Sequence, residues 1–128
     1  MTELLPAVAS GVDAVRTHFA GLPVEVVPDG AGGAFLTVGD VEVGPRYSPS
    51  RTWLGFQISA AYDSADVYPH YVGVLTRTDG RPHGDGIQQV TWRDQAALQL
   101  SRRSNGWRPG IDNAALKAEK VITWLVNQ

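Results

Sequence analysis

The sequence predicts an α+β fold, in which helices at the two ends of the chain enclose a series of short β-strands. Apolar residues recur every three or four positions over residues 3–20 and again near the C-terminus, and this spacing places them on one face of a helix. Between these segments, short β-branched runs alternate with turn dipeptides, as in antiparallel strands. We therefore expect an antiparallel sheet with helices packed on one side.

The first predicted element is a helix from Glu3 to Ala20. Thr2 can cap its start, and Pro6 falls in the first turn, where a missing amide hydrogen costs little. Gly21 is well placed to end it. Its apolar face consists of Leu5, Val8, Val12, Val15 and Phe19.

Short strands are expected next. The first three candidates are Val24–Val27, Ala34–Val38 and Val41–Val43, with Asp29-Gly30 and Gly39-Asp40 as the turns between them. Alternation is clearest from Trp53 to Tyr62, and a further strand is expected at Tyr71–Leu75. From these candidates we expect four strands to form an antiparallel meander.

The remainder of the chain is predicted to be mostly irregular before a final helix. Residues 78–86 are rich in Gly, Pro and Asp and predict a loop or lid. Ile87–Trp92 and Ala96–Ser101 suit short extended pieces, although Asp94–Leu100 also suits a helical turn. After the loop Arg102–Gly110, the last helix is capped by Asp112 or Asn113, with Ala115, Ala118, Ile122 and Leu125 on one face and Val121 beside them.

The length, charge and composition of the chain exclude several classes of function. A chain of 128 residues with 43% hydrophobic and 19% charged residues fits one domain over residues 1–128. A net charge of -2 disfavours nucleic acid, and the absence of a long apolar run or a secretory signal predicts a cytoplasmic protein without a membrane span. Because the sequence has no cysteine, disulfides, thiolate zinc sites and cysteine nucleophiles are excluded. We expect no cofactor.

The order of helix, meander, irregular segment and helix resembles the ubiquitin-conjugating-enzyme-like (UBC-like) fold. Tyr68-Pro69 lies where that fold usually has Tyr-Pro, and Trp107-Arg108-Pro109 lies where it usually has Trp-Ser-Pro. With Ser101-Arg102-Arg103 and Asp112, the C-terminal third is most similar to the bacterial ubiquitin-conjugating-like family. The resemblance implies a ubiquitin-like protein, or another component of its bacterial conjugation pathway, as the partner.

The sequence departs from that family at its catalytic positions. The region that resembles the nucleophile segment reads Ala96, Ala97, Leu98, Gln99, without a cysteine. In place of the His-Pro-Asn motif stands Arg81-Pro82-His83. We therefore predict a non-catalytic binding module. The alternative is an active transferase whose cysteine has been replaced in this sequence.

The predicted partner-binding residues surround this region: Arg102, Arg103, Trp107 and Arg108, with His83 and Asp85 on an adjacent loop that can gate the surface. Arginine beside tryptophan anchors many protein interfaces, and a terminal carboxylate suits an arginine fork. The competing interpretation is that Trp107 is a buried plug and that the arginines form a solvated rim.

Two other groups of residues are alternative candidate sites. His70, His83 and Asp85 are candidates for a metal-dependent or histidine-dependent enzyme, since imidazole and carboxylate groups bind metals and transfer protons. Tyr62, Asp63, Asp66 and Tyr68 are candidates for an acidic pocket lined by aromatic rings. For both sets we favour ordinary loop roles, in which aspartates stabilise turns.

Overall fold

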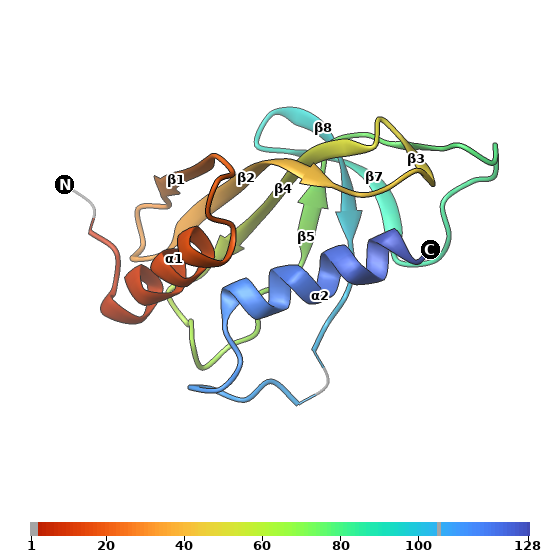
Figure 1. The fold of residues 1–128 in the computed structure, drawn as a ribbon. Coiled ribbons are helices and arrows are strands. Elements are labelled where there is room, and N and C mark those ends of the chain that lie inside the picture. The colour runs from red at the N-terminus through yellow and green to blue at the C-terminus, as the bar shows by residue number, and fades with distance from the viewer. Residues whose placement is uncertain (1–2, 105) are drawn as a thin grey trace.

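Two helices pack on one face of an antiparallel sheet, as the computed structural model shows (Figure 1). The structure describes residues 3–104 and 106–128. Within this part of the chain, a six-stranded sheet has the order β1 (Val24–Pro28), β2 (Ala34–Glu42), β4 (Arg51–Ile58), β5 (His70–Val72), β8 (Gln95–Leu100) and β7 (Ile87–Trp92). The helices are α1 (Pro6–His18) and α2 (Ala114–Val126), and a small pair is formed by β3 (Tyr47–Ser48) and β6 (Thr76–Arg77). The predicted α+β class is confirmed.

Both predicted helices are present, with different ends. Helix α1 begins at Pro6, after Leu5, and its last residue is His18 because Phe19 leaves the helical backbone conformation (φ -102, ψ 34). The expected cap Thr2 lies outside the described residues. At the start of α2, Asn113 accepts a hydrogen bond from the amide of Leu116 at 2.9 Å and is the cap.

Strand β2 replaces two predicted strands. Gly39-Asp40 is not a turn but a β-bulge, since the register with β4 shifts between Val38 and Val41. Asp40 adopts a positive φ of 56°, and the Gly39 amide donates to the carbonyl of Pro23 at 2.9 Å. Both halves of the strand pair with β4, so the dipeptide is absorbed into one bent strand.

The sheet is larger than predicted. Strands β1, β2, β4 and β5 are consecutive neighbours, as in a meander, but β8 and β7 extend them. The sheet thus has six strands in the described chain rather than the expected four, and the short extended pieces expected at Ile87–Trp92 and Ala96–Ser101 are β7 and β8. A two-residue turn at Arg93 (φ 49) and Asp94 (φ 66) closes the β7–β8 hairpin. Positive φ at both positions gives the type I′ geometry that matches strand twist.

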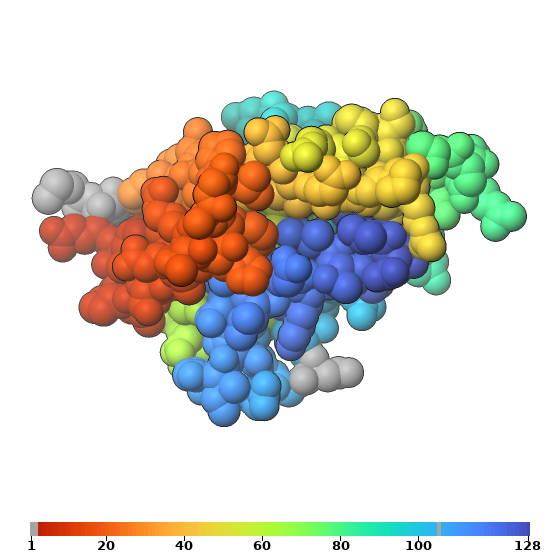
Figure 2. All heavy atoms as spheres, viewed as in Figure 1, coloured from red at the N-terminus to blue at the C-terminus, as the bar shows by residue number. Residues whose placement is uncertain are grey.

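The core lies between the sheet and the two helices. Helices α1 and α2 lie side by side on the face seen in Figure 2. The predicted helix-face residues Val8, Val12, Val15, Ala115, Ala118 and Leu125 are buried, as are Leu36, Leu54, Phe56, Leu98 and Leu100 of the sheet. Val121 is buried and Ile122 only partly so, because the apolar face of α2 is rotated slightly from the predicted one.

The opposite face of the sheet is aromatic. Trp92 folds over it and stacks on Tyr71 and Trp53, with ring centroids 4.8 and 5.7 Å away. The ring occupies space above Gly55, where an added Cβ would lie 2.3 Å from a ring carbon. A glycine is therefore required at position 55 for the hairpin to lie across the sheet.

Candidate functional site

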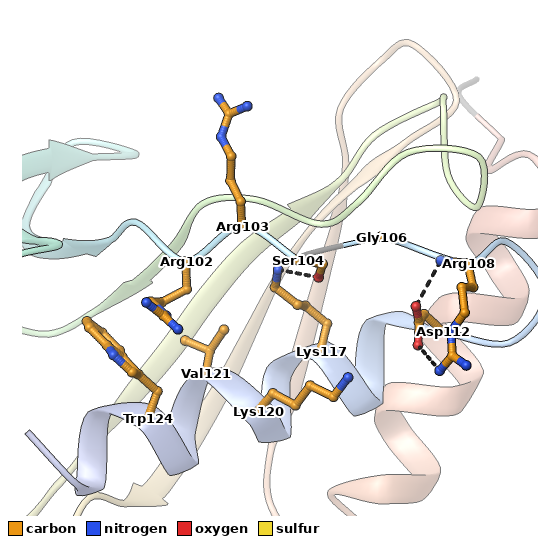
Figure 3. A pocket seen from close by; sticks show the side chains of 10 residues that line it. All are labelled: Arg102, Arg103, Ser104, Gly106, Arg108, Asp112, Lys117, Lys120, Val121 and Trp124. Carbon is orange, nitrogen blue, oxygen red and sulfur yellow. Dashed lines mark hydrogen bonds and ion pairs between the residues drawn. The ribbon is translucent and has the colours of Figure 1, made fainter.

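A basic groove lies between residues 102–104 and 106–112 on one side and helix α2 on the other (Figure 3). It has a volume of about 470 Å³, within the range of ligand pockets. Its cationic side chains come from both walls: Arg102, Arg103 and Arg108 from the segment, and Lys117 and Lys120 from the helix. Ser104, Gly106, Asp112, Val121 and Trp124 complete the lining.

Positive charge exceeds negative charge in the groove. Arg108 pairs with Asp112 at 3.3 Å, and Lys117 pairs with Asp66 at 2.9 Å. No salt bridge among residues 3–104 and 106–128 involves Arg102, Arg103 or Lys120. Five cations less two carboxylates leave a local charge of +3, whereas the whole chain carries -2. The groove therefore attracts anions.

The two neighbouring arginines point in different directions (Figure 3). The guanidinium of Arg102 lies over the ring of Trp124, 5.0 Å from its centroid, and faces α2. Arg103 extends away from the hollow and lies 4.6 Å from the ring centroid of Tyr68. Lys120 points toward the far end of the groove, where Asp112 lies. Arg102 and Lys120 are thus better placed than Arg103 to contact an anion in the groove.

A hydrogen-bonded cluster supports the floor of the groove. Lys117 is only 4% exposed, and its Nζ donates to Asp66 at 2.9 Å and to the Ser104 hydroxyl at 2.7 Å. The Ser104 amide donates to Asp66 at 2.8 Å. Burial acts to raise the pKa of Asp66, but the Ser104 amide and Lys117 outweigh it and lower the pKa below its usual value.

Trp107 is a packing residue. Its indole nitrogen donates to the carbonyl oxygen of Asp63 at 2.7 Å, and its ring meets the edge of Tyr62 with centroids 6.3 Å apart. The ring is half-buried against the core and does not line the groove. Trp107 is therefore a half-buried packing residue rather than a fully buried plug, whereas Arg102, Arg103 and Arg108 line the hollow.

The side chains of the predicted acidic pocket anchor loops, as the favoured interpretation expects, and Tyr62 and Asp63 also line a hollow of about 280 Å³. Asp63 accepts a hydrogen bond from the Gly110 amide at 3.0 Å, and Asp66 binds Ser104 and Lys117. The hydroxyl of Tyr62 accepts from the amide of Ala114 at 3.1 Å. These side chains join residues 62–66 to the segment that forms the groove.

His83 and Asp85 do not line the groove. The Nε2 atom of His83 lies 2.7 Å from the carbonyl oxygen of Leu75, and its ring stacks on Tyr47 with centroids 6.2 Å apart. Asp85 is exposed. The histidine therefore holds the loop before β7 against the body of the protein.

His70 is fully buried against Phe56, with ring centroids 5.0 Å apart. Neither ring nitrogen has a hydrogen-bond partner among the described residues. Burial, followed by the charge of Lys117, lowers the pKa of His70 to about 3. In the described part of the chain no three His, Cys, Asp or Glu side chains are grouped to hold a metal ion, so the metal-enzyme alternative gains no support.

The segment that resembles the nucleophile region of conjugating enzymes lies inside the sheet. Ala96, Ala97, Leu98 and Gln99 belong to β8, which pairs with β5 on one side and β7 on the other. Ala97 and Leu98 are buried, Ala96 is exposed and Gln99 is half-exposed. The short extended piece expected at Ala96–Ser101 is thus strand β8, which the hairpin turn at Arg93 and Asp94 brings back between β7 and β5.

Sequence reasoning missed Lys120 and Trp124. Both lie on α2, four residues apart, with Lys117 and Val121 at the same helical spacing, so one side of the helix forms one wall of the groove. This spacing was available from the sequence, but exposed charged positions on a helix usually face only solvent.

No family model, curated protein or solved structure significantly matches this chain. Within the residues described, no helix has the length and apolar character needed to cross a membrane.

Proposed function

We propose that this protein is a non-catalytic UBC-like binding module, which binds a ubiquitin-like protein or another component of its bacterial conjugation pathway. The resemblance of Tyr68-Pro69 and Trp107-Arg108-Pro109 to the family motifs supplies the class of partner. The observation on which the proposal depends is the groove, with Arg102, Arg103 and Lys120 free of carboxylate partners in the described chain.

The groove suits an extended, negatively charged segment. Arg102 is held over Trp124, so a bound carboxylate would meet a guanidinium whose position is already restricted. Lys120 offers a second cation from the opposite wall. A segment that ends in a free carboxylate, or carries acidic side chains, can bridge the two walls through charge-assisted hydrogen bonds.

The test compares charge-matched double variants. Arg102→Ala/Lys120→Ala removes the two cations that face the hollow, whereas Arg51→Ala/Arg81→Ala removes the same charge outside it. A ubiquitin-like protein encoded near this protein is titrated against each by calorimetry at two salt concentrations. We expect the groove variant to bind at least about tenfold more weakly, since each lost charge-assisted hydrogen bond costs about 1.5–3 kcal/mol.

Arg103→Ala separates the sequence prediction from the structural one. Because Arg103 points away from the hollow, its removal is expected to weaken binding less than removal of Arg102. Equal affinity of the wild type and the Arg102→Ala/Lys120→Ala variant would remove the groove from the proposal.

The non-catalytic part of the proposal has its own test. A cysteine at position 97 or 98 would be buried in β8, whereas one at position 96 or 99 would reach solvent. Ala96→Cys and Gln99→Cys are therefore the variants to incubate with an activating enzyme, ATP and a ubiquitin-like protein. We expect no thioester. A thioester sensitive to reducing agent would favour the transferase alternative.

A further inference from the structure

The groove contains the one exposed lysine of the chain. The sequence has only two lysines, Lys117 and Lys120, and both lie on α2. Lys117 is 4% exposed, and its Nζ donates to both carboxylate oxygens of Asp66 and to the Ser104 hydroxyl, so its three hydrogens are engaged. Lys120 is exposed and takes part in no salt bridge among the described residues. Its amine is therefore the lysine amine that is free to react.

Arginines lie at both ends of the Lys120 side chain. At one end, Arg102 lies over Trp124, which follows Lys120 by one helical turn. At the other end, Arg108 pairs with Asp112, whose pKa is lowered by hydrogen bonds from Arg108 and to a smaller extent by the charge of Lys120. Figure 3 shows the Lys120 side chain between these two ends. A small anion held by Arg102 thus lies about one helical turn from the start of a flexible four-carbon side chain.

We propose that Lys120 is a site of acylation by small anionic acyl donors of the acyl phosphate type. The positive groove selects for the charge of the donor, and the free amine selects for an electrophilic carbonyl group. The same groove disfavours an aldehyde as the reacting group. A protonated imine would remain a cation beside Arg102 and Arg108, whereas the amide formed by acylation is neutral.

The reaction needs only the lysine and the donor. The unprotonated amine of Lys120 attacks the carbonyl carbon of the acyl phosphate, and an N–C bond forms. The bond from that carbon to the phosphoryl oxygen breaks, phosphate leaves with the electron pair, and the amine proton passes to water. Arg102 binds the phosphoryl oxygens of the donor and stabilises the negative charge that phosphate gains as it leaves. No group is oxidised or reduced.

Acylation of Lys120 lowers the charge of the groove. Four cations less two carboxylates leave a local charge of +2, where the unmodified groove has +3. The consequence for the partner rests on the proposed function: the acylated protein is expected to bind it about tenfold more weakly, since one charge-assisted hydrogen bond is lost. The acylation reaction itself involves no partner.

Incubation with acetyl phosphate tests the proposal, with the acetylated residues and their rates determined by peptide mass spectrometry. Arg81→Lys adds a reference lysine at an exposed position outside the groove. In this variant we expect Lys120 to be acetylated at least about tenfold faster than the reference lysine, since a cationic groove concentrates anions by that order. Lys117 is expected to stay unmodified. Added salt and inorganic phosphate are expected to reduce the difference between Lys120 and the reference lysine.

Two controls separate binding of the donor from the ordinary reactivity of an exposed lysine. The uncharged ester p-nitrophenyl acetate is expected to acetylate Lys120 and the reference lysine at similar rates, because the groove does not attract it. Arg102→Ala, added to Arg81→Lys, is expected to slow the acetylation of Lys120 by acetyl phosphate at least about fivefold, since a charge-assisted hydrogen bond to the donor is lost. The rate at the reference lysine is expected to stay the same.

Three results would overturn the acylation proposal. They are equal rates of acetylation at Lys120 and the reference lysine, the same preference for Lys120 with the uncharged ester, and a Lys120 rate unaffected by Arg102→Ala. All three are measured without a protein partner. Failure of the acylation proposal and failure of the proposed partner binding are therefore distinguishable.

Discussion

Buried His70 makes stability depend on pH in a range where carboxylates contribute little. Its pKa is lowered from 6.5 to about 3, first by burial and then by the charge of Lys117. The unfolded chain takes up a proton below pH 6.5, whereas the folded chain keeps the ring neutral. The folded state therefore keeps its full stability above pH 6.5. Its free energy of unfolding falls by about 1.4 kcal/mol per pH unit as the pH drops from 6.5 toward about 3.

Between pH 7 and pH 5 the free energy of unfolding falls by about 2 kcal/mol, because the loss begins only below pH 6.5. The assay is urea denaturation at pH 7, 6 and 5, followed by tryptophan fluorescence. His70→Leu is expected to abolish most of the loss. It is also expected to be about 1 kcal/mol more stable at pH 7, since two buried nitrogens without partners are replaced by apolar atoms.

His18→Gln is the matched control, because His18 is a partly exposed histidine that pairs at the surface with Glu119 at 3.4 Å. We expect this variant to lose stability with acid much as the wild type does. A wild type equally stable at pH 7 and pH 5, or a His70→Leu variant with an undiminished loss, would refute the reasoning.

Two further predictions concern the supports of the groove and of the hairpin. Lys117→Met leaves Asp66 without its cation and is expected to cost about 2–3 kcal/mol by urea denaturation, at the low end for buried pairs because Asp66 retains 19% side-chain exposure. Adding Asp66→Asn is expected to recover part of that cost, and no recovery would argue against the pair. Gly55→Ala places a Cβ 2.3 Å from Trp92 and is expected to cost about 1–3 kcal/mol and alter the near-ultraviolet circular dichroism. An unchanged spectrum would show that Trp92 does not occupy this position.

The helices were predictable because local spacing and capping determine them. Pro6 and Asn113 stand at helix starts, and the apolar positions of both helices face the sheet. The sheet was less predictable, since register depends on partners distant in sequence. Gly39-Asp40 has the composition of a turn but lies within one strand, whereas Arg93-Asp94 lacks the glycine typical of a type I′ turn but forms one.

The residues of the candidate site were likewise predictable only where a local sequence pattern indicated them. Arg102 and Arg108 were predicted from their clustering near tryptophans, and both line the groove. The pair of Lys117 and Asp66 joins residues 51 positions apart, so no local pattern indicates it. The ubiquitin-related function stays a prediction until the partner is tested.

The hydrogen bonds that join residues 62–66 to the segment forming the groove affect how the groove would respond to a ligand. Asp63 and Asp66 hold residues 104, 107 and 110 through backbone and side-chain hydrogen bonds, so one wall of the groove is fixed before anything binds. Binding then orders few protein groups, and more of the interaction free energy contributes to affinity. We expect the free and bound forms to differ in side-chain rotamers of Arg102 and Lys120 rather than in backbone position, so the groove would act as a preformed receptor.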